Sequence, residues 1–130
     1  MRAKISLVTI WTDNIESMKT FYNEILGFKI KNDLGEYVEF QNTGVRFAIC
    51  KRSIMHNYSD VFKENHSGQG FELAFPCDSV EALDRTYEKL LSSGVKGIHK
   101  PQNMPWNQRT ALFSDPDGNI HEIFTELNKV

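Results

Sequence analysis

The stretch of sequence that decides the fold is residues 111–127, ALFSDPDGNIHEIFTEL. Its centre, DPDG at residues 115–118, is typical of a tight turn, because proline presets φ, aspartate tolerates turn geometry and Gly118 can adopt a positive φ without steric cost. Apolar residues flank the turn, which predicts two antiparallel strands joined by a three-residue loop with a glycine bulge. Side chains alternate along a strand, so Glu122 should lie on one face and His121 on the other. A carboxylate at Glu122, between two apolar neighbours on its face, is the chemical anomaly of this hairpin.

The composition limits what this carboxylate can serve. The chain has 130 residues, enough for one domain or for two small halves that share a core. With 40% hydrophobic and 25% charged residues it has the composition of an ordinary soluble protein. A net charge of −2 and the lack of a long lysine or arginine run argue against a nucleic-acid partner. Cys50 and Cys77 lack metal-site spacing, and no signal peptide or membrane-spanning run is found, so we expect a cytoplasmic protein with free thiols and no membrane partner.

The first half of the chain is predicted to begin with a strand followed by a helix. Residues 4–12, KISLVTIWT, are rich in β-branched and aromatic residues, as strands are. From residue 15 to residue 26 the apolar residues recur with helical spacing, which predicts a helix lying on a sheet. Asp13 and Glu16 have the spacing of a capping box at the start of this helix, and Gly27 marks its end.

A hairpin and a long connection follow the helix. Residues 36–41 and 45–51 alternate in polarity around the turn sequence NTG, which predicts two further strands. Residues 53–70 are polar, and this connection is expected to separate two units of the chain. His56 and His66 lie in it and are more readily explained as solvated than as functional, although a connection of this length is able to fold over a cavity.

The second half of the chain repeats the first with an offset of 65 residues. The offset pairs Asp13 with Asp78 and Tyr22 with Tyr87, and it aligns the apolar stripes of the two predicted helices. It also aligns the strands that precede them, and a later hairpin follows in each half in the same order. A repeat of strand, helix and further strands predicts two similar modules and a two-fold arrangement of two sheets.

Four motifs in these segments carry a family resemblance. They are NIE at residues 14–16, FY at 21–22, LGF at 26–28 and DPDGNIHE at 115–122. With them the chain resembles the vicinal-oxygen-chelate superfamily, which includes glyoxalase I, extradiol dioxygenases, fosfomycin-modifying enzymes and bleomycin-resistance proteins. The resemblance implies an α+β fold of two βαβββ modules, each a curved mixed sheet with a helix on its outer face, that enclose a cavity. It implies one domain over residues 1–130, with module 1 at about 1–55, the connector at about 53–70 and module 2 at about 70–130.

The resemblance also implies where a metal would be bound. Metal-dependent members of the superfamily take ligands from the first and the last strand of each module. These positions fall here at Leu7, about Ala48, Glu72 and Glu122. Only Glu72 and Glu122 are able to coordinate an ion, and two carboxylates without an imidazole favour Mg²⁺ or Mn²⁺ over Zn²⁺. We therefore expect either no cofactor or a divalent ion of this kind.

Two carboxylates facing one apolar cavity would repel each other unless a cation lies between them. If Ala48 faces the cavity, strand alternation puts Arg46 on the same face, where it could take the charge role of a metal. The alternative is that Glu72 and Glu122 are solvated at the cavity mouth and that Arg46 forms a surface pair. His121 points away from Glu122 and is expected to be structural.

Two tryptophans and an arginine complete the candidates for ligand binding. Trp106 lies in a polar stretch with two prolines, and binding residues concentrate on such loops. Trp11 and Trp106 are candidates for the apolar walls of a site for an aromatic ligand, or for packing in the core or a dimer. Arg109 is a candidate for binding an anionic group, although the hairpin register pairs it with Thr125, away from the face of Glu122.

The predicted function is small-molecule binding. We expect a protein of the glyoxalase/bleomycin-resistance type that holds a small organic molecule in the cavity between its modules. Members of the superfamily are usually homodimers, so we expect a homodimer here. If it is an enzyme, Glu122 is the candidate catalytic residue of a metal-dependent lyase, dioxygenase or transferase. The alternative is a metal-free protein that sequesters a drug or metabolite without catalysis. The incomplete ligand set favours binding, whereas the small net charge does not favour a cationic drug.

Overall fold

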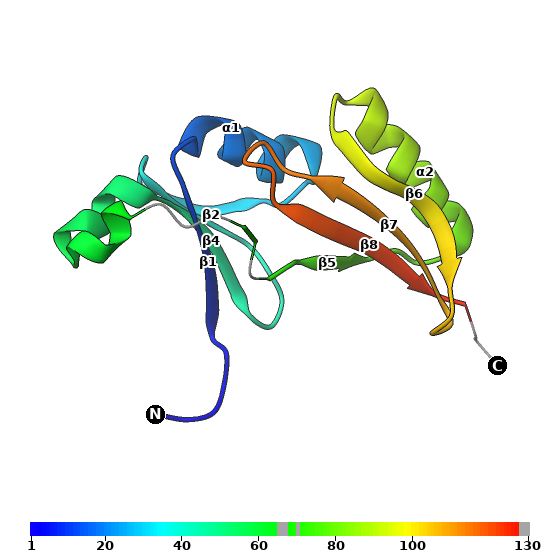
Figure 1. Cartoon of the computed structure of the whole chain (residues 1–130), viewed down its shortest axis with the longest axis horizontal. Coiled ribbons are helices and arrows are strands. Elements are labelled where there is room, and N and C mark those ends of the chain that lie inside the picture. The colour runs from blue at the N-terminus through cyan, green and yellow to red at the C-terminus, as the bar shows by residue number, and fades with distance from the viewer. Residues whose placement is uncertain (65–67, 70, 128–130) are drawn as a thin grey trace. The chain divides into compact units, whose positions relative to one another are not determined.

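The computed structural model describes residues 1–64, 68–69 and 71–127, and the chain divides into two compact units, Met1–Ser67 and Gly68–Val130. Unit 1 contains β1 (Leu7–Thr12), α1 (Ile15–Thr20), the π-helical turn η1 (Phe21–Ile25), β2 (Ile30–Asp33), β3 (Tyr37–Phe40) and β4 (Arg46–Lys51). Its sheet has the order β1-β4-β3-β2, in which β1 is parallel to β4 and the other pairs are antiparallel. Figure 1 shows α1 over one side of this sheet.

The core of unit 1 lies between α1, η1 and the sheet. Met18 and Tyr22 are fully buried, and the Tyr22 ring meets the ring of Phe47 edge-on at a centroid distance of 5.3 Å. The predicted helical stripe is therefore confirmed, and the helix ends before Gly27, which has φ 89°. The predicted capping box is wrong, because the N-cap is Asn14 and the helix begins one residue later than the box requires.

The connection after β4 is partly helical, which the sequence analysis did not predict. It contains the short 3₁₀ helices η2 (Arg52–Asn57) and η3 (Asp60–Lys63). The ring of Phe62 in η3 meets the ring of Trp11 on β1 edge-on, at a centroid distance of 4.9 Å. The first part of the connection is thus packed against the sheet of unit 1.

Unit 2 repeats the architecture of unit 1. It contains β5 (Ala74–Pro76), α2 (Val80–Ser92), β6 (Lys96–Met104), β7 (Gln108–Ser114) and β8 (Ile120–Glu126). The sheet has the order β5-β8-β7-β6, with β5 parallel to β8 and the other pairs antiparallel, which matches unit 1 strand for strand. α2 packs on one face of this sheet (Figure 1). The predicted α+β fold of two βαβββ modules is confirmed.

The helix α2 fits closely against β6. Its buried stripe is Leu83, Tyr87 and Leu90, as predicted from the helical spacing. Gly97 on β6 lies where a β-carbon would meet the hydroxyl of Tyr87 and, at 2.9 Å, a methyl group of Leu91. The helix and strand approach each other this closely because residue 97 has no side chain.

The turn at residues 115–118 is built around the buried carboxylate of Asp115. This carboxylate accepts hydrogen bonds from the backbone N–H of Asp117 at 3.0 Å and of Asn119 at 2.9 Å, and from the Asn119 amide at 2.9 Å. Gly118 has φ 86°, the positive value that the turn sequence predicted. The hairpin register pairs Leu112 with Glu122, so the predicted hairpin is confirmed.

His121 is a buried structural residue on the face that packs toward α2. Its Nδ1 accepts a hydrogen bond from the backbone N–H of Leu73 at 3.2 Å, and its Nε2 lies 3.6 Å from the carboxylate of Asp115. It therefore links β8 to the segment before β5, on the face opposite Glu122, as the alternation predicted.

Cys50 and Cys77 are both free thiols, as predicted. In the part of the chain that the structure describes, no helix is long and apolar enough to cross a membrane.

Candidate functional site

In unit 1, the sheet face opposite α1 carries an ion pair between a buried carboxylate and an exposed guanidinium. Glu39 on β3 lies directly across from Ala48 on β4 and is 5% exposed. Arg46 donates two hydrogen bonds to it, from Nε at 2.9 Å and from Nη2 at 2.7 Å. These bonds hold the pKa of Glu39 below its ordinary value, although burial acts in the opposite direction. Such side-on pairing fixes the guanidinium in one orientation.

Glu39 was not among the predicted site residues, although its sequence context carries a signal. Glu39 stands between Val38 and Phe40, so it is a carboxylate in an apolar strand, like Glu122. Arg46 was expected either to take the charge role of a metal or to form a surface pair. The structure pairs it with the nearly buried Glu39 on the neighbouring strand.

Trp11 lies on the same face, at the end of the sheet near the connection. Cys50 is directly across from it on β4, and Tyr37 follows on β3. The indole is 41% exposed, with Phe62 edge-on to it and the guanidinium carbon of Arg52 at 6.0 Å from its ring centre. Trp11 therefore combines packing against the connection with an accessible part of its ring.

In unit 2, Glu122 lies on the sheet face opposite α2. It is paired with Ala74 on β5 and with Leu112 on β7. Its carboxylate is half-buried, and the residues that the structure describes offer it neither a hydrogen-bond donor nor a cation. Burial raises the pKa of Glu122 above its ordinary value, and the nearby carboxylate of Glu72 raises it further.

The strand registers relate the two sheets position by position. Thr9 pairs with Ala48, and Ala74, which is 65 residues after Thr9, pairs with Glu122. Ala48 and Glu122 therefore occupy equivalent places. By the same offset Leu7, at the start of β1, corresponds to Glu72, which is exposed and lies two residues before β5.

Arg109 is not brought to the face of Glu122. Arg109 pairs with Thr125 as predicted, and its guanidinium donates to Asp84 of α2 at 2.8 Å and to Asn103 at 2.9 Å. Trp106 lies in the turn between β6 and β7, is 59% exposed, and donates a hydrogen bond to Gln108 at 3.0 Å. Of the histidines in the connection, His56 is half-buried in η2, and His66 lies outside the described residues.

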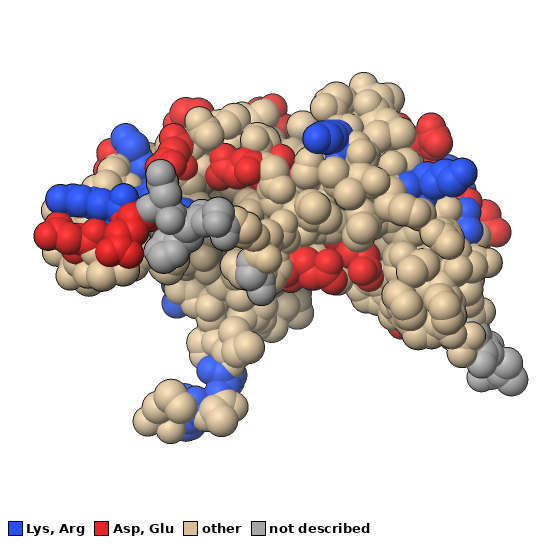
Figure 2. Space-filling model, in the orientation of Figure 1, with Lys and Arg blue, Asp and Glu red and all other residues tan. Residues whose placement is uncertain are grey.

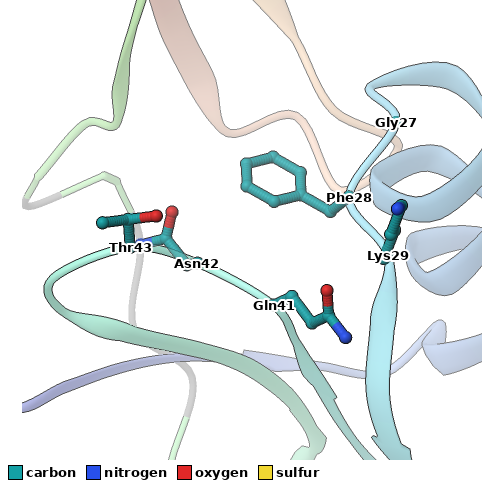
Figure 3. Close-up of a pocket in the computed structure, with 6 residues that line it drawn as sticks. All are labelled: Gly27, Phe28, Lys29, Gln41, Asn42 and Thr43. Atoms are coloured by element: carbon teal, nitrogen blue, oxygen red, sulfur yellow. The ribbon is translucent and has the colours of Figure 1, made fainter.

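Two hollows that the sequence analysis did not foresee open beside the β3–β4 hairpin. The larger, of about 460 Å³, is lined by Gly27, Phe28, Lys29, Gln41, Asn42 and Thr43. Figure 3 shows the ring of Phe28 extending toward the side of this hollow formed by Asn42 and Thr43. The smaller, of about 240 Å³, is lined by Lys31, Glu39, Phe40, Gln41, Asn42 and Arg46. The two hollows share Gln41 and Asn42.

The sequence pattern of the glyoxalase-like domain matches residues 5–128. The chain belongs to the glyoxalase-like family. It is a member of the vicinal-oxygen-chelate superfamily, as its motifs indicated. The uncharacterized protein YraH of Bacillus subtilis is 30% identical to this glyoxalase-like chain over 131 residues, which cover 95% of this chain and 99% of YraH.

Solved structures share the fold of this glyoxalase-like protein. A glyoxalase/bleomycin resistance protein/dioxygenase from Nocardioides superposes with a TM-score of 0.84 at 26% identity, covering 100% of this chain and 87% of the other. A family enzyme of the same description from Burkholderia phytofirmans has a TM-score of 0.86 at 23% identity, with 96% and 100% of the two chains covered. The second similarity shows the fold alone.

The donor atoms of this glyoxalase-like chain do not fit a tightly held transition-metal ion. Of the four family positions, Leu7 and Ala48 are hydrocarbon, and only Glu72 and Glu122 offer oxygen. Within residues 1–64, 68–69 and 71–127 there is no group of three or more histidine, cysteine, aspartate or glutamate side chains that could hold a metal. A structural or catalytic zinc ion takes at least three protein ligands.

Proposed function

We propose that this protein binds a small organic molecule at Glu122, on the sheet face opposite α2. The observation that carries the proposal is the half-buried carboxylate of Glu122, which has no donor or cation partner among the described residues and a raised pKa. A desolvated carboxylate without a partner costs stability, and such a cost is typical of a functional site. A ligand that donates a hydrogen bond to Glu122 would offset it.

The surroundings of Glu122 indicate the chemistry of the ligand. Ile120 and Phe124 precede and follow it on the same face of β8, and Leu112 lies across from it. These side chains suit an apolar or aromatic group. Glu72 and Glu122 repel each other, so a protonated amine on the ligand would bind more favourably than a carboxylate. The proposed ligand is an apolar molecule with an amine or hydroxyl donor.

A thermal-shift screen of aromatic amines, diols, thiol conjugates and antibiotics would identify such a ligand, because binding to the folded state raises the melting temperature. The best compound is then titrated calorimetrically into wild type, Glu122→Gln and Glu126→Gln. Glu126 is the matched control, since it lies on the same face of β8 but is exposed and bound to Gln108. We expect Glu122→Gln to weaken binding at least tenfold, the loss of a charge-assisted hydrogen bond. Equal affinity in all three proteins would refute the proposal.

A second candidate function is proton transfer by Glu122. The raised pKa favours it, because a general base works best when its pKa lies near the working pH. In this case Glu122 would take a proton from the donor group of the bound molecule and return it to the product. Turnover of a ligand that is lost in Glu122→Gln while the ligand still binds would support catalysis. Loss of binding alone would support sequestration.

We also propose that the protein is a cytoplasmic homodimer without a nucleic-acid or membrane partner. β1 and β2 are the edge strands of one sheet and β5 and β6 those of the other, and pairing with a second copy is one way in which proteins cover such edges. Figure 2 shows acidic and basic side chains interspersed on the visible face, without a continuous basic surface. Light scattering at micromolar concentration should give twice the 15.0 kDa mass of the chain. A species of 15.0 kDa would refute the dimer.

A further inference from the structure

Arg46 lines the smaller hollow of unit 1 and keeps an edge of its guanidinium that no described residue occupies. A guanidinium carries five N–H donors. Glu39 takes one from Nε and one from Nη2, and the described residues accept none of the others. The side chain of Arg46 is 55% exposed and lines the hollow. One N–H of Nη1 and the second N–H of Nη2 lie side by side on the free edge. Two donors in this arrangement can bind an oxyanion through two parallel hydrogen bonds.

A β-bulge brings a second cation to the same place. The register between β2 and β3 shifts between Ile30 and Asn32, so Lys31 and Asn32 both stand opposite Glu39. Bulges re-aim side chains and are common beside functional sites. The Lys31 Nζ lies 3.7 Å from the Glu39 carboxylate, which is too far for a good hydrogen bond, so its N–H groups remain available.

The charges around this hollow do not cancel. Lys31 and Arg46 share the single carboxylate of Glu39, which leaves one positive charge uncompensated. The remaining lining includes the side chain of Gln41, a neutral residue with amide donors, and no other acidic residue. Lys29 lines the adjoining hollow and adds to the positive potential.

We propose that Lys31 and Arg46 form a binding site for an oxyanion, the carboxylate or phosphate group of a small molecule. Glu39 holds the guanidinium in position from one side, and the oxyanion binds to its free edge and to Lys31. The site lies in unit 1 and does not depend on ligand binding at Glu122.

Titration of ¹⁵N-labelled protein with acetate, inorganic phosphate and neutral acetamide tests the site by NMR. Acetate and phosphate should shift the Nε–H signal of Arg46 and the backbone amide of Gln41, and acetamide should not. Addition of 0.5 M sodium chloride should weaken the binding of both anions, because the site is partly exposed and the salt screens its positive charges. Tighter binding of acetate would indicate an organic acid as the natural ligand, and tighter binding of phosphate a phosphate ester.

The variant Lys31→Met removes one cation and leaves the Glu39–Arg46 pair intact. We expect it to weaken anion binding by roughly fivefold, as for a partly exposed charge pair. Lys19→Met is the matched control, since Lys19 is a lysine of the same unit that pairs with Glu16 and Asp33. It should bind the anions like wild type. Wild-type affinity in Lys31→Met, or equal shifts from acetamide, would overturn the proposal. Lys31 is 59% exposed and Lys19 is 26% exposed, so thermal melts of both variants verify that each is folded.

Discussion

Ala48 and Glu122 occupy the same place in two equivalent sheets, yet one is a methyl group and the other a carboxylate. Each lies on the strand next to the first strand of its unit and pairs with that strand, at Thr9 and Ala74 respectively. The carboxylate of unit 1 stands one strand further on, at Glu39, where Arg46 neutralises it. The two units thus use one backbone arrangement with different charge placement.

The first prediction follows from the raised pKa of Glu122. An acid whose pKa is higher in the folded state favours folding when protonated, and this contribution is lost as the pH rises through the folded pKa. Glu122→Gln cannot ionise, so it should be more stable than wild type at pH 7, by roughly 0.5 kcal/mol. The difference should shrink below pH 4.5, the ordinary value for glutamate. Thermal melts at pH 7 and below pH 4.5 measure this difference. Glu88→Gln, at an exposed position, is the control and should have the melting temperature of wild type at both pH values. A less stable variant at pH 7 would contradict the assignment.

The second prediction concerns metal. With oxygen donors at only two of the four family positions, the dialysed protein should hold no stoichiometric zinc, nickel or iron by elemental analysis. Chelator should leave its melting temperature unchanged. One tightly held ion per chain would show that another residue, such as His56, supplies a ligand.

The third prediction concerns the turn at residues 115–118. Asp115→Ala removes three hydrogen bonds to a buried carboxylate and leaves backbone N–H groups of the turn without their acceptor. We expect a loss of roughly 2–4 kcal/mol in the free energy of unfolding, measured by urea denaturation. Asp60→Ala, on the exposed helix η3, should change it by less than about 0.5 kcal/mol. Similar losses in both variants would argue against the anchoring role of Asp115.

The fourth prediction concerns the contact between α2 and β6. Gly97→Ala places a methyl group against the hydroxyl of Tyr87, so we expect it to destabilise by roughly 1–3 kcal/mol through overpacking. Tyr87→Phe removes that hydroxyl and should recover part of the loss in the double variant. Chemical denaturation of all four proteins gives the interaction energy. Strict additivity would mean that the strand moves away from the helix instead.

The fifth prediction separates Arg109 from ligand binding. Its guanidinium is held by Asp84 and Asn103 on the face that packs toward α2, so Arg109→Met should destabilise by roughly 0.5–1 kcal/mol and leave ligand affinity unchanged. A double-mutant cycle with Asp84→Asn should show most of this loss as coupling. A drop in ligand affinity without loss of stability would restore Arg109 as a binding residue.

Features set by local sequence were predictable. The turn at residues 115–118 and the stripe of α2 depend on proline, glycine and helical spacing, which act within a few residues of each other. The resemblance implied β6, but the sequence pattern did not locate it, because this segment is polar and contains Pro101. Its extended form comes from pairing with β7, and strand preference depends strongly on such neighbours.

The candidate site was predictable in part. The face of Glu122 followed from alternation along one strand, because the turn fixes the register. The partner of Arg46 depended on the pairing of two strands, and the hairpin at residues 36–51 was predicted without its register being worked out. The strands predicted at residues 36–41 and 45–51 leave a three-residue loop, which would pair Glu39 with Phe47 and put Arg46 on the opposite face. The observed register pairs Glu39 with Ala48 and so puts Glu39 and Arg46 on one face. The position of Lys31 beside Glu39 could not have been predicted, because the bulge shifts the strand register by one residue.

The pairing of Glu39 with Arg46 also bears on how a repeated sequence diverges. The Glu39 carboxylate is neutralised by a residue of its own sheet. Substitutions in unit 2 therefore do not change the pairing of this charge. In the other copy, the described residues supply no counter-ion for Glu122. The two copies of the repeat therefore differ in the placement of their charged side chains while keeping the same strand order.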